Sequence, residues 1–362
     1  MTTALPGAVR SYHVTSGAGI DGLTLRVGAP RRPGPGEVAV AVHAVSLSFR
    51  ELLVLRGRYV LPVRPDVVPV SDGAGEVVAV GPGVRRVRPG DRVTAALFPL
   101  WRDGPLRPQW LPQLGGSLDG LLTELAVLPE QALVPVPGHL SYAEAATLPC
   151  AAVTAWNALT GDGTGVRPGQ TVVTTGSGGV SLFAIQLAKV LGATVVATTG
   201  RPDRARRLRD LGADEVVDSA AVPAWHTAVR ELTGGRGADR VVHTAGPLEE
   251  SARCLAVSGH LALVGSLGSA SGRSAEGSTE GSTEGSTGGW APLDPGLLFG
   301  VAGTLRAVAV GSHAQFTELA EVVAAHRLRP VIARTFPFEA AREALRHYET
   351  AAPFGKVVIA VR

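Results

Sequence analysis

The chain of 362 residues is too long for one ordinary hydrophobic core and suits two domains. Apolar residues make up 45% and charged residues 18%, a balance typical of a soluble globular protein, and no run of 18 apolar residues predicts a membrane span. The formal charge of +3 rests almost wholly on scattered arginines, and only 5% of residues are aromatic, which argues against a nucleic-acid partner.

The N-terminal sequence and the cysteines indicate the cellular compartment. The start, MTTALPGAVRSYHV, lacks a basic segment followed by an apolar stretch, so we expect no secretory signal and a cytoplasmic protein. The two cysteines are Cys150 and Cys254. We interpret each as a small buried apolar residue rather than as half of a disulfide.

The first third of the chain is predicted to be rich in β-strands. Glu37–Val45 alternates polar and apolar residues, and Gly75–Val80 and Asp91–Ala95 are short strands separated by Gly-Pro turns. Phe49–Leu55 is expected to form a short helix. Short strands at this spacing favour a small barrel or a sandwich.

After Pro137, helical and strand patterns alternate. Ser141 and Glu144 have the spacing of a capping box, before a helix predicted over Ala145–Leu159. Nearly continuous apolar strands that alternate with helices then indicate a parallel sheet covered on both faces. The strands are expected at Thr171–Thr175, Thr194–Thr198, Glu215–Val217, Arg240–His243, His260–Val264 and Leu305–Val310, and the helices at Val180–Leu191, Asp203–Leu211 and Val222–Leu232.

The C-terminal part holds a low-complexity tract and a tail. Ser271–Gly289, built of Gly, Ser, Thr and Glu, is expected to be a mobile loop, which we interpret as a tolerated insertion rather than a lid. The tail should return to the first domain, because a cofactor domain with six strands is already complete. The predicted domain boundaries are 1–136, 137–312 and 313–362. In the tail we expect helices at Phe316–His326 and Phe338–Thr350, and strands at Val331–Phe336 and Lys356–Val361.

A glycine-rich loop links the first predicted strand of the parallel sheet to its helix. Glycines there permit a tight turn and close approach of backbone amides to a pyrophosphate, at the N-terminus of the helix. Ser181 replaces the third glycine of the usual pattern and is small enough to allow close packing. The context of strand, loop, helix and second strand makes this a dinucleotide-binding site. Its predicted residues are Gly176, Ser177, Gly178, Gly179 and Val180.

The end of the second strand indicates which dinucleotide is bound. An NAD-preferring site usually places an acidic residue here to hold the ribose hydroxyls. The sequence instead has Thr199, Gly200 and Arg201, which leave space and positive charge for a 2′-phosphate, with Arg204 as a helper. NADP is therefore favoured, NAD stays possible, and a solvated surface position is the alternative for Arg201.

Nearly the whole chain resembles the medium-chain dehydrogenase/reductase superfamily. The supporting stretches are PGEVAVAVHAVS, GAGEVVAVGPGVRRVRPGDRV, EAATLPCAAVTAWNAL, TGSGGVSLFAIQLAKVLGATVVATT, RDLGADEVVD and the terminal GKVVI. The resemblance implies an α/β protein with a GroES-like β-barrel catalytic domain and a doubly wound parallel-sheet (Rossmann) cofactor domain. It also implies a homodimer or homotetramer.

Comparison with the zinc alcohol dehydrogenases of that superfamily argues against a metal. A catalytic zinc needs three protein ligands. The first cysteine position holds Ser48, the His-Glu pair is replaced by Ser71-Asp72, and only Cys150 remains at the third position. The sequence therefore resembles the zinc-free, quinone-oxidoreductase-like branch, and we expect no zinc.

The resemblance also implies roles for individual residues. Ser48 and Glu51 replace an asparagine and an aspartate of the branch's NxxDxxxxxGxY stretch, whereas Tyr59 matches its tyrosine and Thr154 matches a threonine placed near the nicotinamide. Strand ends of the sheet should line the nicotinamide side. The remaining residues assigned to cofactor binding are Ser48, Thr154, Gly265, Ser266, Leu267, Gly311, Ser312 and Lys356.

Without a metal, hydrogen-bond donors must stabilise the negative charge that develops when hydride reaches a carbonyl or an enone. Tyr59 is the first candidate as donor or proton source, and Asp72, if burial keeps it neutral, is the second. Together with Thr154 they form the predicted catalytic set. We expect hydride transfer from NADPH to an α,β-unsaturated carbonyl or a quinone. The alternatives are reduction of a simple ketone or aldehyde, and a non-catalytic NADPH-binding sensor or scaffold.

Overall fold

The computed structural model describes residues 5–265 and 293–362. The predicted mobile loop 271–289 and the site residues Ser266 and Leu267 lie outside this part of the chain. Unit 1 comprises residues 1–164, 177–187 and 309–362, and unit 2 comprises residues 165–176 and 188–308. The domain boundaries predicted from the sequence stay a prediction.

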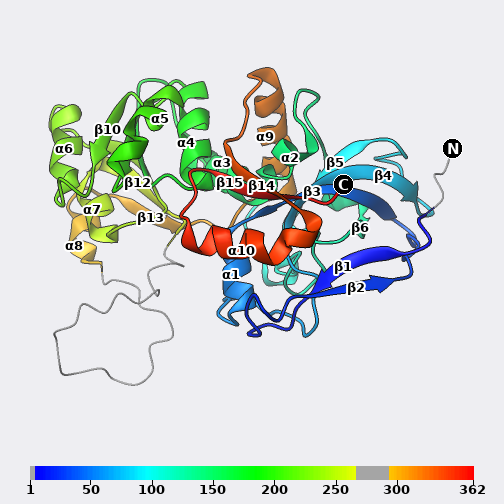
Figure 1. The fold of residues 1–362 in the computed structure, drawn as a ribbon. Coiled ribbons are helices and arrows are strands. Elements are labelled where there is room, and N and C mark those ends of the chain that lie inside the picture. Colours follow the sequence, from blue (N-terminus) through cyan, green and yellow to red (C-terminus); the bar gives the residue numbers. More distant parts are fainter. Residues whose placement is uncertain (1–4, 266–292) are drawn as a thin grey trace. The chain divides into compact units, whose positions relative to one another are not determined.

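A seven-stranded sheet forms the frame of unit 1, with the order β14-β15-β3-β4-β5-β7 and β6 paired to β3 (Figure 1). The long strand β3 is central because it pairs antiparallel with β4, β6 and β15. The C-terminal strand β15 is thereby tied to the N-terminal part of the chain. β1 and β2 form a separate two-stranded sheet. The strands of unit 1 are β1 (Val9–His13), β2 (Thr24–Gly28), β3 (Glu37–Leu47), β4 (Asp72–Val80), β5 (Arg92–Ala95), β6 (Leu125–Pro129), β7 (Leu133–Pro135), β14 (Ile332–Pro337) and β15 (Lys356–Ala360).

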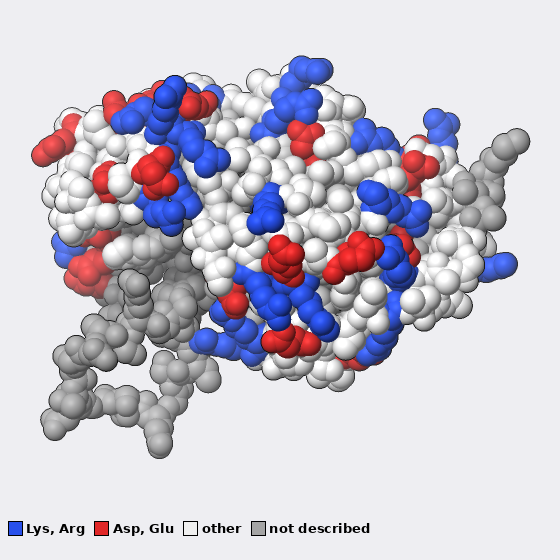
Figure 2. Space-filling model, viewed as in Figure 1, with Lys and Arg blue, Asp and Glu red and all other residues white. Residues whose placement is uncertain are grey.

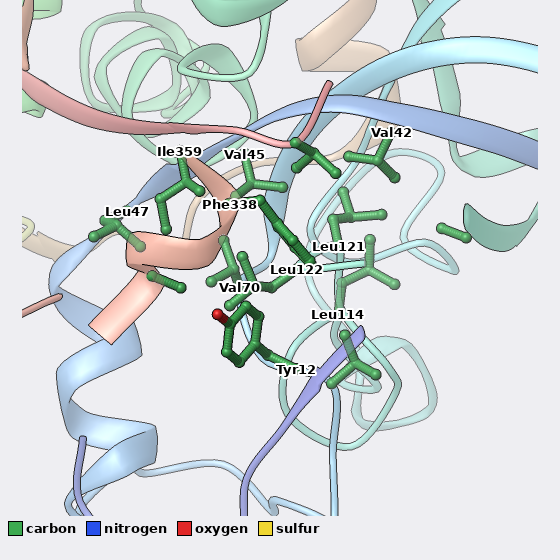
Figure 3. Packing of buried hydrophobic residues seen from close by; sticks show 14 of the residues in the cluster. Tyr12, Val42, Val45, Leu47, Val70, Leu114, Leu121, Leu122, Phe338 and Ile359 are labelled. Carbon is green, nitrogen blue, oxygen red and sulfur yellow. The ribbon is translucent and has the colours of Figure 1, made fainter. Parts of the chain in front are cut away.

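Aliphatic side chains from strands far apart in the sequence form the core of unit 1. Val42, Val45 and Leu47 of β3 lie in the same cluster as Ile359 of β15, and Figure 3 shows them around the ring of Phe338. Burying such side chains contributes roughly 1.5–3 kcal/mol each. The core therefore holds the C-terminal tail against β3, which fixes the residue that begins β15.

The helices of unit 1 include one that departs from the prediction. The capping box of Ser141 and Glu144 is present, but the helix predicted over Ala145–Leu159 is wrong as one continuous element. It is divided into two α-helices joined by a π-helical turn at Leu148–Ala152, because Pro149 has no backbone N–H and its ring disfavours a regular helix. The helices are α1 (Phe49–Leu55), α2 (Tyr142–Ala145), α3 (Val153–Thr160), α9 (His313–Ala325) and α10 (Ala341–Thr350).

Unit 2 holds a six-stranded parallel sheet with the order β10-β9-β8-β11-β12-β13. This is the doubly wound order, which reverses direction between β8 and β11, and ligands bind at such a switch point. The predicted Rossmann fold is confirmed. The strands are β8 (Thr171–Thr175), β9 (Thr194–Thr199), β10 (Glu215–Asp218), β11 (Ala238–His243), β12 (Leu255–Leu263) and β13 (Thr304–Ala307).

The remaining helices follow the strands of the parallel sheet. The predicted helix over Val222–Leu232 begins only at Trp225, whose indole is buried in the core of unit 2. The strand predicted over Leu305–Val310 ends at Ala307, and Val310 has a positive φ of 54° that is incompatible with a strand. The helices are α4 (Gly179–Val190), α5 (Ala205–Asp210), α6 (Trp225–Leu232), α7 (Leu248–Arg253) and α8 (Pro295–Phe299).

The helices and the charged surface bear on whether the chain holds a membrane-spanning segment or a continuous basic patch. In the described ranges, no helix is both long enough and apolar enough to cross a bilayer. Figure 2 shows basic side chains interspersed with acidic ones on the face in view, rather than a continuous basic surface.

Candidate functional site

The loop between β8 and α4 has the backbone geometry that its glycines predict. Gly176 has a φ of 78°, in the left-handed region that favours glycine, and its N–H donates to the carbonyl of Thr198. No atom lies within 4 Å of a Cβ built on Gly178, so the loop is open there. Ser181 is fully buried, as expected for a small residue at a close packing position. The loop fits a pyrophosphate at the N-terminus of a 12-residue helix.

The end of β9 combines a small residue with basic side chains. The hydroxyl of Thr199 accepts a hydrogen bond from the backbone N–H of Arg201, which fixes the chain after Gly200. The Arg201 side chain is about half exposed and lies 3.5 Å from Asp203. Burial lowers the pKa of Arg204, and the positive charge of Arg201 lowers it further. The two arginines therefore form one electropositive region.

The carboxyl ends of β8, β11 and β12 are tied together in unit 2. Thr175 accepts from the backbone N–H groups of Thr244 and Ala245 at 2.9 and 3.1 Å, and the Thr244 hydroxyl donates to the Thr175 carbonyl. A Cβ at Gly265 would lie 2.1 Å from the Thr244 oxygen, so only glycine is accommodated. Gly265 is thus part of the strand ends where a ligand is expected.

Two residues predicted from the resemblance, Thr154 and Ser312, use their hydroxyls within unit 1, and a third, Gly311, has no room for a side chain. The Thr154 hydroxyl donates to the carbonyl of Cys150 at 2.6 Å. Ser312 caps α9 by accepting from the backbone N–H of Gln315, and a Cβ at Gly311 would lie 2.7 Å from Val153. Contacts of Thr154, Gly311 and Ser312 with substrate or cofactor stay predictions.

A buried charged group lies where α1, β4 and β15 begin. Asp72 is fully buried and accepts hydrogen bonds from the hydroxyls of Ser48 (3.2 Å) and Ser71 (2.9 Å). The ammonium of Lys356 lies 3.5 Å from the same carboxylate and donates to Ser48 Oγ at 2.7 Å. Burial raises the pKa of Asp72, whereas the charge of Lys356 lowers it. Ser48, Asp72 and Lys356 therefore form one network.

A second ion pair continues this network along α1. Glu51 accepts from the guanidinium of Arg50 at 2.9 Å and from the backbone N–H of Ser71 at 3.2 Å. The Ser71 hydroxyl lies within hydrogen-bond distance of both Glu51 and Asp72. The Arg50 guanidinium also stacks over the ring of Tyr59, 4.7 Å from its centroid. The structure thus brings Tyr59, Asp72 and Ser48 to one cluster.

The charges of this cluster shift the pKa values of Cys150 and Tyr348. Burial and the charge of Asp72 together raise the pKa of the Cys150 thiol to about 12, so the thiol stays protonated at neutral pH. This argues against a nucleophilic role, since the thiolate is the reactive form. The Tyr348 pKa is raised by burial and by its neighbours Cys150 and Glu51. Tyr348 therefore shares the environment of the predicted site residues.

An unusual backbone conformation positions Ser71 and Asp72. Val70, immediately before them, has a φ of 70° although it is β-branched and fully buried. Such a conformation costs about 1–3 kcal/mol and persists only where the surroundings impose it. Here the Val70 carbonyl accepts from Leu121 N–H at 2.7 Å, and Gly115 packs directly against the Val70 backbone. The start of β4 is strained and held in place.

The residues at this cluster do not match the donor set of a catalytic zinc. Cys150 is the only sulfur ligand that they offer, and Ser48 and Ser71 stand at the other expected positions. In the part of the chain that the structure describes, no group of three or more His, Cys, Asp or Glu side chains is arranged to hold a metal ion. Asp72 is already paired with the Lys356 ammonium and accepts hydrogen bonds from two hydroxyls.

The fold and the glycine loop define an NAD(P)-dependent oxidoreductase. Residues 34–138 match the alcohol dehydrogenase GroES-like domain, and residues 179–324 match the zinc-binding dehydrogenase family. The zinc-type alcohol dehydrogenase-like protein of Schizosaccharomyces pombe is 36% identical over 336 residues, which cover 92% of this chain and 93% of the relative. A quinone oxidoreductase of Pseudomonas aeruginosa is 35% identical over 67% of this chain and 68% of its own length. The chain belongs to the medium-chain dehydrogenase/reductase superfamily.

Solved structures agree with this assignment. A Sinorhizobium meliloti protein assigned to the alcohol dehydrogenases superposes with a TM-score of 0.87 and 34% identity, over 99% of this chain and all of that one. An NAD-dependent alcohol dehydrogenase superposes with a TM-score of 0.82 and 34% identity, over 98% of this chain and 100% of that one. The predicted family and fold are confirmed.

Sequence reasoning missed two members of the cluster, and the cofactor role that it assigned to a third, Lys356, stays a prediction. Arg50 and Tyr348 were not predicted, because an arginine in a short helix and a tyrosine in an amphipathic C-terminal helix carry no motif of their own. Lys356 was predicted as a cofactor residue, and the structure places its ammonium beside Ser48 and Asp72. Lys356 could have been singled out in the sequence, because it is one of only two lysines in an arginine-rich chain.

Proposed function

We propose that this protein is an NADP(H)-dependent reductase that transfers hydride, without zinc, to an α,β-unsaturated carbonyl compound or a quinone. The observation that carries the proposal is the chemistry at the positions of the zinc ligands. A hydroxyl and a carboxylate stand there, bonded to an ammonium. A substrate oxygen must therefore be stabilised by hydrogen-bond donors rather than by a metal ion.

The loop at Gly176–Val180 would hold the pyrophosphate of the cofactor, and the arginines after β9 support NADP. When bound, NADPH supplies the hydride. A 2′-phosphate is attracted by Arg201 and Arg204, whereas Thr199 offers no carboxylate to pair with ribose hydroxyls. Gly200 leaves room beside Ser219, the nearest atom to its Cβ position at 3.7 Å.

Tyr59 is the proposed donor to the substrate oxygen. A tyrosine hydroxyl is protonated at neutral pH and is able to donate both a hydrogen bond and a proton. The Arg50 guanidinium lies over the ring, 4.7 Å from its centroid, and holds the tyrosine in place. Asp72 is the second candidate, because burial raises its pKa. A donating role requires the protonated carboxyl, whereas the charged form accepts from Ser48 and pairs with Lys356. The network of Asp72 with Ser48 and Ser71 orients its carboxyl group.

The reaction is tested with purified protein and two substrate panels. NADPH oxidation is followed with enones and quinones on one side and saturated ketones and aldehydes on the other, and products are identified by mass spectrometry. We expect saturation of the carbon–carbon double bond, or quinol formation, and the same turnover after dialysis against a chelator. Alcohol products alone, or activity that depends on added zinc, would contradict the proposal.

The second candidate function is reduction of simple ketones or oxidation of alcohols. It is supported by the similarity to proteins described as alcohol dehydrogenases, at 34–36% identity. The substrate panels distinguish the two, because they give different products. A third candidate is a sensor or scaffold that binds NADPH without catalysis. Calorimetric binding of NADPH with no turnover of any electrophile would favour that class.

Cofactor preference is tested separately at Arg201. We expect Arg201→Ala to lower kcat/KM with NADPH about tenfold, since a hydrogen bond to a charged group is worth roughly 1.5–3 kcal/mol. Activity with NADH should change little, because no phosphate is present there. An equal loss with both cofactors would assign Arg201 to structure rather than to the 2′-phosphate.

We also propose a cytoplasmic homodimer or homotetramer that acts on a small molecule and uses no nucleic acid or membrane. β13 is the edge strand of the parallel sheet, and the exposed apolar side chains of Val257 and Phe299 lie on unit 2. Exposed apolar surface of this kind favours association. Light scattering after gel filtration should give a multiple of the 37.2 kDa chain mass.

A further inference from the structure

The ammonium of Lys356 is enclosed by acceptors. Nζ lies 2.6 Å from the carbonyl oxygen of Leu47, 2.7 Å from Ser48 Oγ and 3.5 Å from Asp72 Oδ2. Lys356 is 3% exposed, so water contributes little to its solvation. An ammonium has three N–H donors, of which two bond Leu47 and Ser48, and the Asp72 carboxylate lies at ion-pair distance. Lys356 is therefore held as a fixed, buried cation.

The fold makes room for this side chain along its whole length. A Cβ at Gly179 would lie 2.7 Å from Lys356 Cδ, so the glycine loop passes directly over the lysine stem. Gly355, just before it, has a φ of 104° and no space for a side chain, and the Lys356 N–H donates to the Val331 carbonyl at 2.9 Å. Two glycines and a fixed backbone thus direct the lysine to Ser48 and Asp72.

The acceptors around Lys356 are those that would otherwise serve a metal ion. Ser48 and Asp72 stand where the resemblance to zinc alcohol dehydrogenases expects ligands. Ser48 Oγ accepts a hydrogen bond from Nζ, and Asp72 forms an ion pair with it. A divalent cation bound by the same two side chains would meet a fixed positive charge at contact distance. Such repulsion is strong where water is excluded.

We propose that Lys356 is the resident cation of the site, a positioning residue that occupies the place of the metal and excludes it. Its charge balances Asp72, and Ser48, which accepts from Nζ, donates its own proton to the Asp72 carboxylate. The order of donors, from Lys356 to Ser48 to Asp72, is thereby fixed. The inference rests on the metal-free part of the proposed function.

The test introduces zinc-type ligands at this site and measures whether Lys356 weakens metal binding to them. Ser48→Cys/Ser71→His, together with Cys150 and Asp72, supplies a zinc-type donor set. This double variant is compared with the triple variant that adds Lys356→Met, which keeps the length of the side chain and removes its charge. Cobalt(II) is the probe, because thiolate-bound tetrahedral cobalt absorbs in the visible range. A parallel triple variant with Lys356→Gln guards against misfolding, and circular dichroism and thermal melting verify the fold.

We expect cobalt to bind at least tenfold more tightly when Lys356 is replaced. Equal affinities, or no cobalt binding by either triple variant, would overturn the proposal. Failure of the proposed function would show itself separately from failure of this inference. It would appear in the wild-type protein as bound zinc or as alcohol products alone, and neither result depends on the cobalt comparison.

Binding of NADPH separates this role from that of a cofactor ligand. In the otherwise unchanged protein, Lys356→Met should bind NADPH with an affinity within about threefold of wild type, since Nζ is buried and directed to Leu47, Ser48 and Asp72. A loss of tenfold or more in NADPH affinity would assign Lys356 to the cofactor and overturn the proposal. With a substrate in hand, kcat should fall while KM for NADPH stays the same.

Discussion

The guanidinium carbon of Arg50 lies 4.7 Å from the centroid of the Tyr59 ring, and the same guanidinium donates to Glu51. One buried arginine therefore connects the proposed proton donor to the ion-pair network of α1. A cation over an aromatic face is worth about 0.5–2 kcal/mol, which is enough to hold the ring in one orientation. Tyr59 is thus held beside the Arg50 guanidinium.

Tyr59→Phe should lower kcat by about 10²- to 10⁴-fold with little change in the KM for NADPH, because it removes a proton donor and preserves the stacked ring. Steady-state kinetics of NADPH oxidation measure this. The matched control is Tyr142→Phe, whose ring stacks on His43. Unchanged turnover in Tyr59→Phe would remove Tyr59 from the mechanism.

Asp72→Asn should destabilise the fold by about 3–5 kcal/mol, because it leaves the buried ammonium of Lys356 without its counter-charge. Urea unfolding at pH 7 measures the change. Asp72→Asn/Lys356→Met should recover part of the loss, as expected for a coupled pair. The control is Glu343→Gln, whose ion pair with Arg334 is exposed and should contribute less than about 1 kcal/mol.

Gly179→Ala should lower stability by about 1–3 kcal/mol, because the added methyl group lies 2.7 Å from the Lys356 stem, whose head group is fixed. Gly178→Ala serves as the stability control, since no atom lies within 4 Å of its Cβ position. Thermal melting of both variants gives the comparison. Equal melting temperatures would show that the lysine stem moves aside without cost.

Stability should fall as the pH is lowered from about 7 to about 4. Burial lowers the pKa of His243 to about 4, below its value near 6.5 in the unfolded chain. The unfolded state therefore binds a proton in this range that the folded state does not, which weakens the fold by up to about 3 kcal/mol. His13, His43 and His313 act in the same direction, because burial also lowers each pKa.

Urea unfolding at pH 7 and pH 5 tests this dependence. His243→Gln should reduce the difference in unfolding free energy between the two pH values, and His326→Gln, at an exposed helix end, is the control. A pH dependence that is the same in His243→Gln and in wild type would contradict the assignment.

The parallel sheet could be predicted from the sequence because its signals are local. Apolar strands such as Thr171–Thr175 alternate with helices, and the glycine loop stands at the one place where it is diagnostic. The break in the helix after Ala145 was missed because a strong apolar pattern outweighed Pro149. The edge elements β1 and β2 lack a clear alternation, and the side chains of β2 are exposed.

The charged cluster could be predicted only in part. The resemblance supplied Tyr59 and Asp72, but no local pattern links residues as distant as Ser48 and Lys356. Their contact depends on the antiparallel pairing of β15 with β3, which brings residues more than 300 positions apart to 2.7 Å. Such a contact depends on tertiary structure, and no local sequence pattern predicts it.

The conformation of Val70 has a consequence for ligand binding. A valine held at positive φ has few alternative conformations once Leu121 and Gly115 fix its backbone. The two residues that follow it, Ser71 and Asp72, are therefore already ordered in the protein before any substrate arrives. The entropy of arranging these polar groups is lost during folding rather than during binding, so this edge of the site should be preorganised and should change little between free and occupied states.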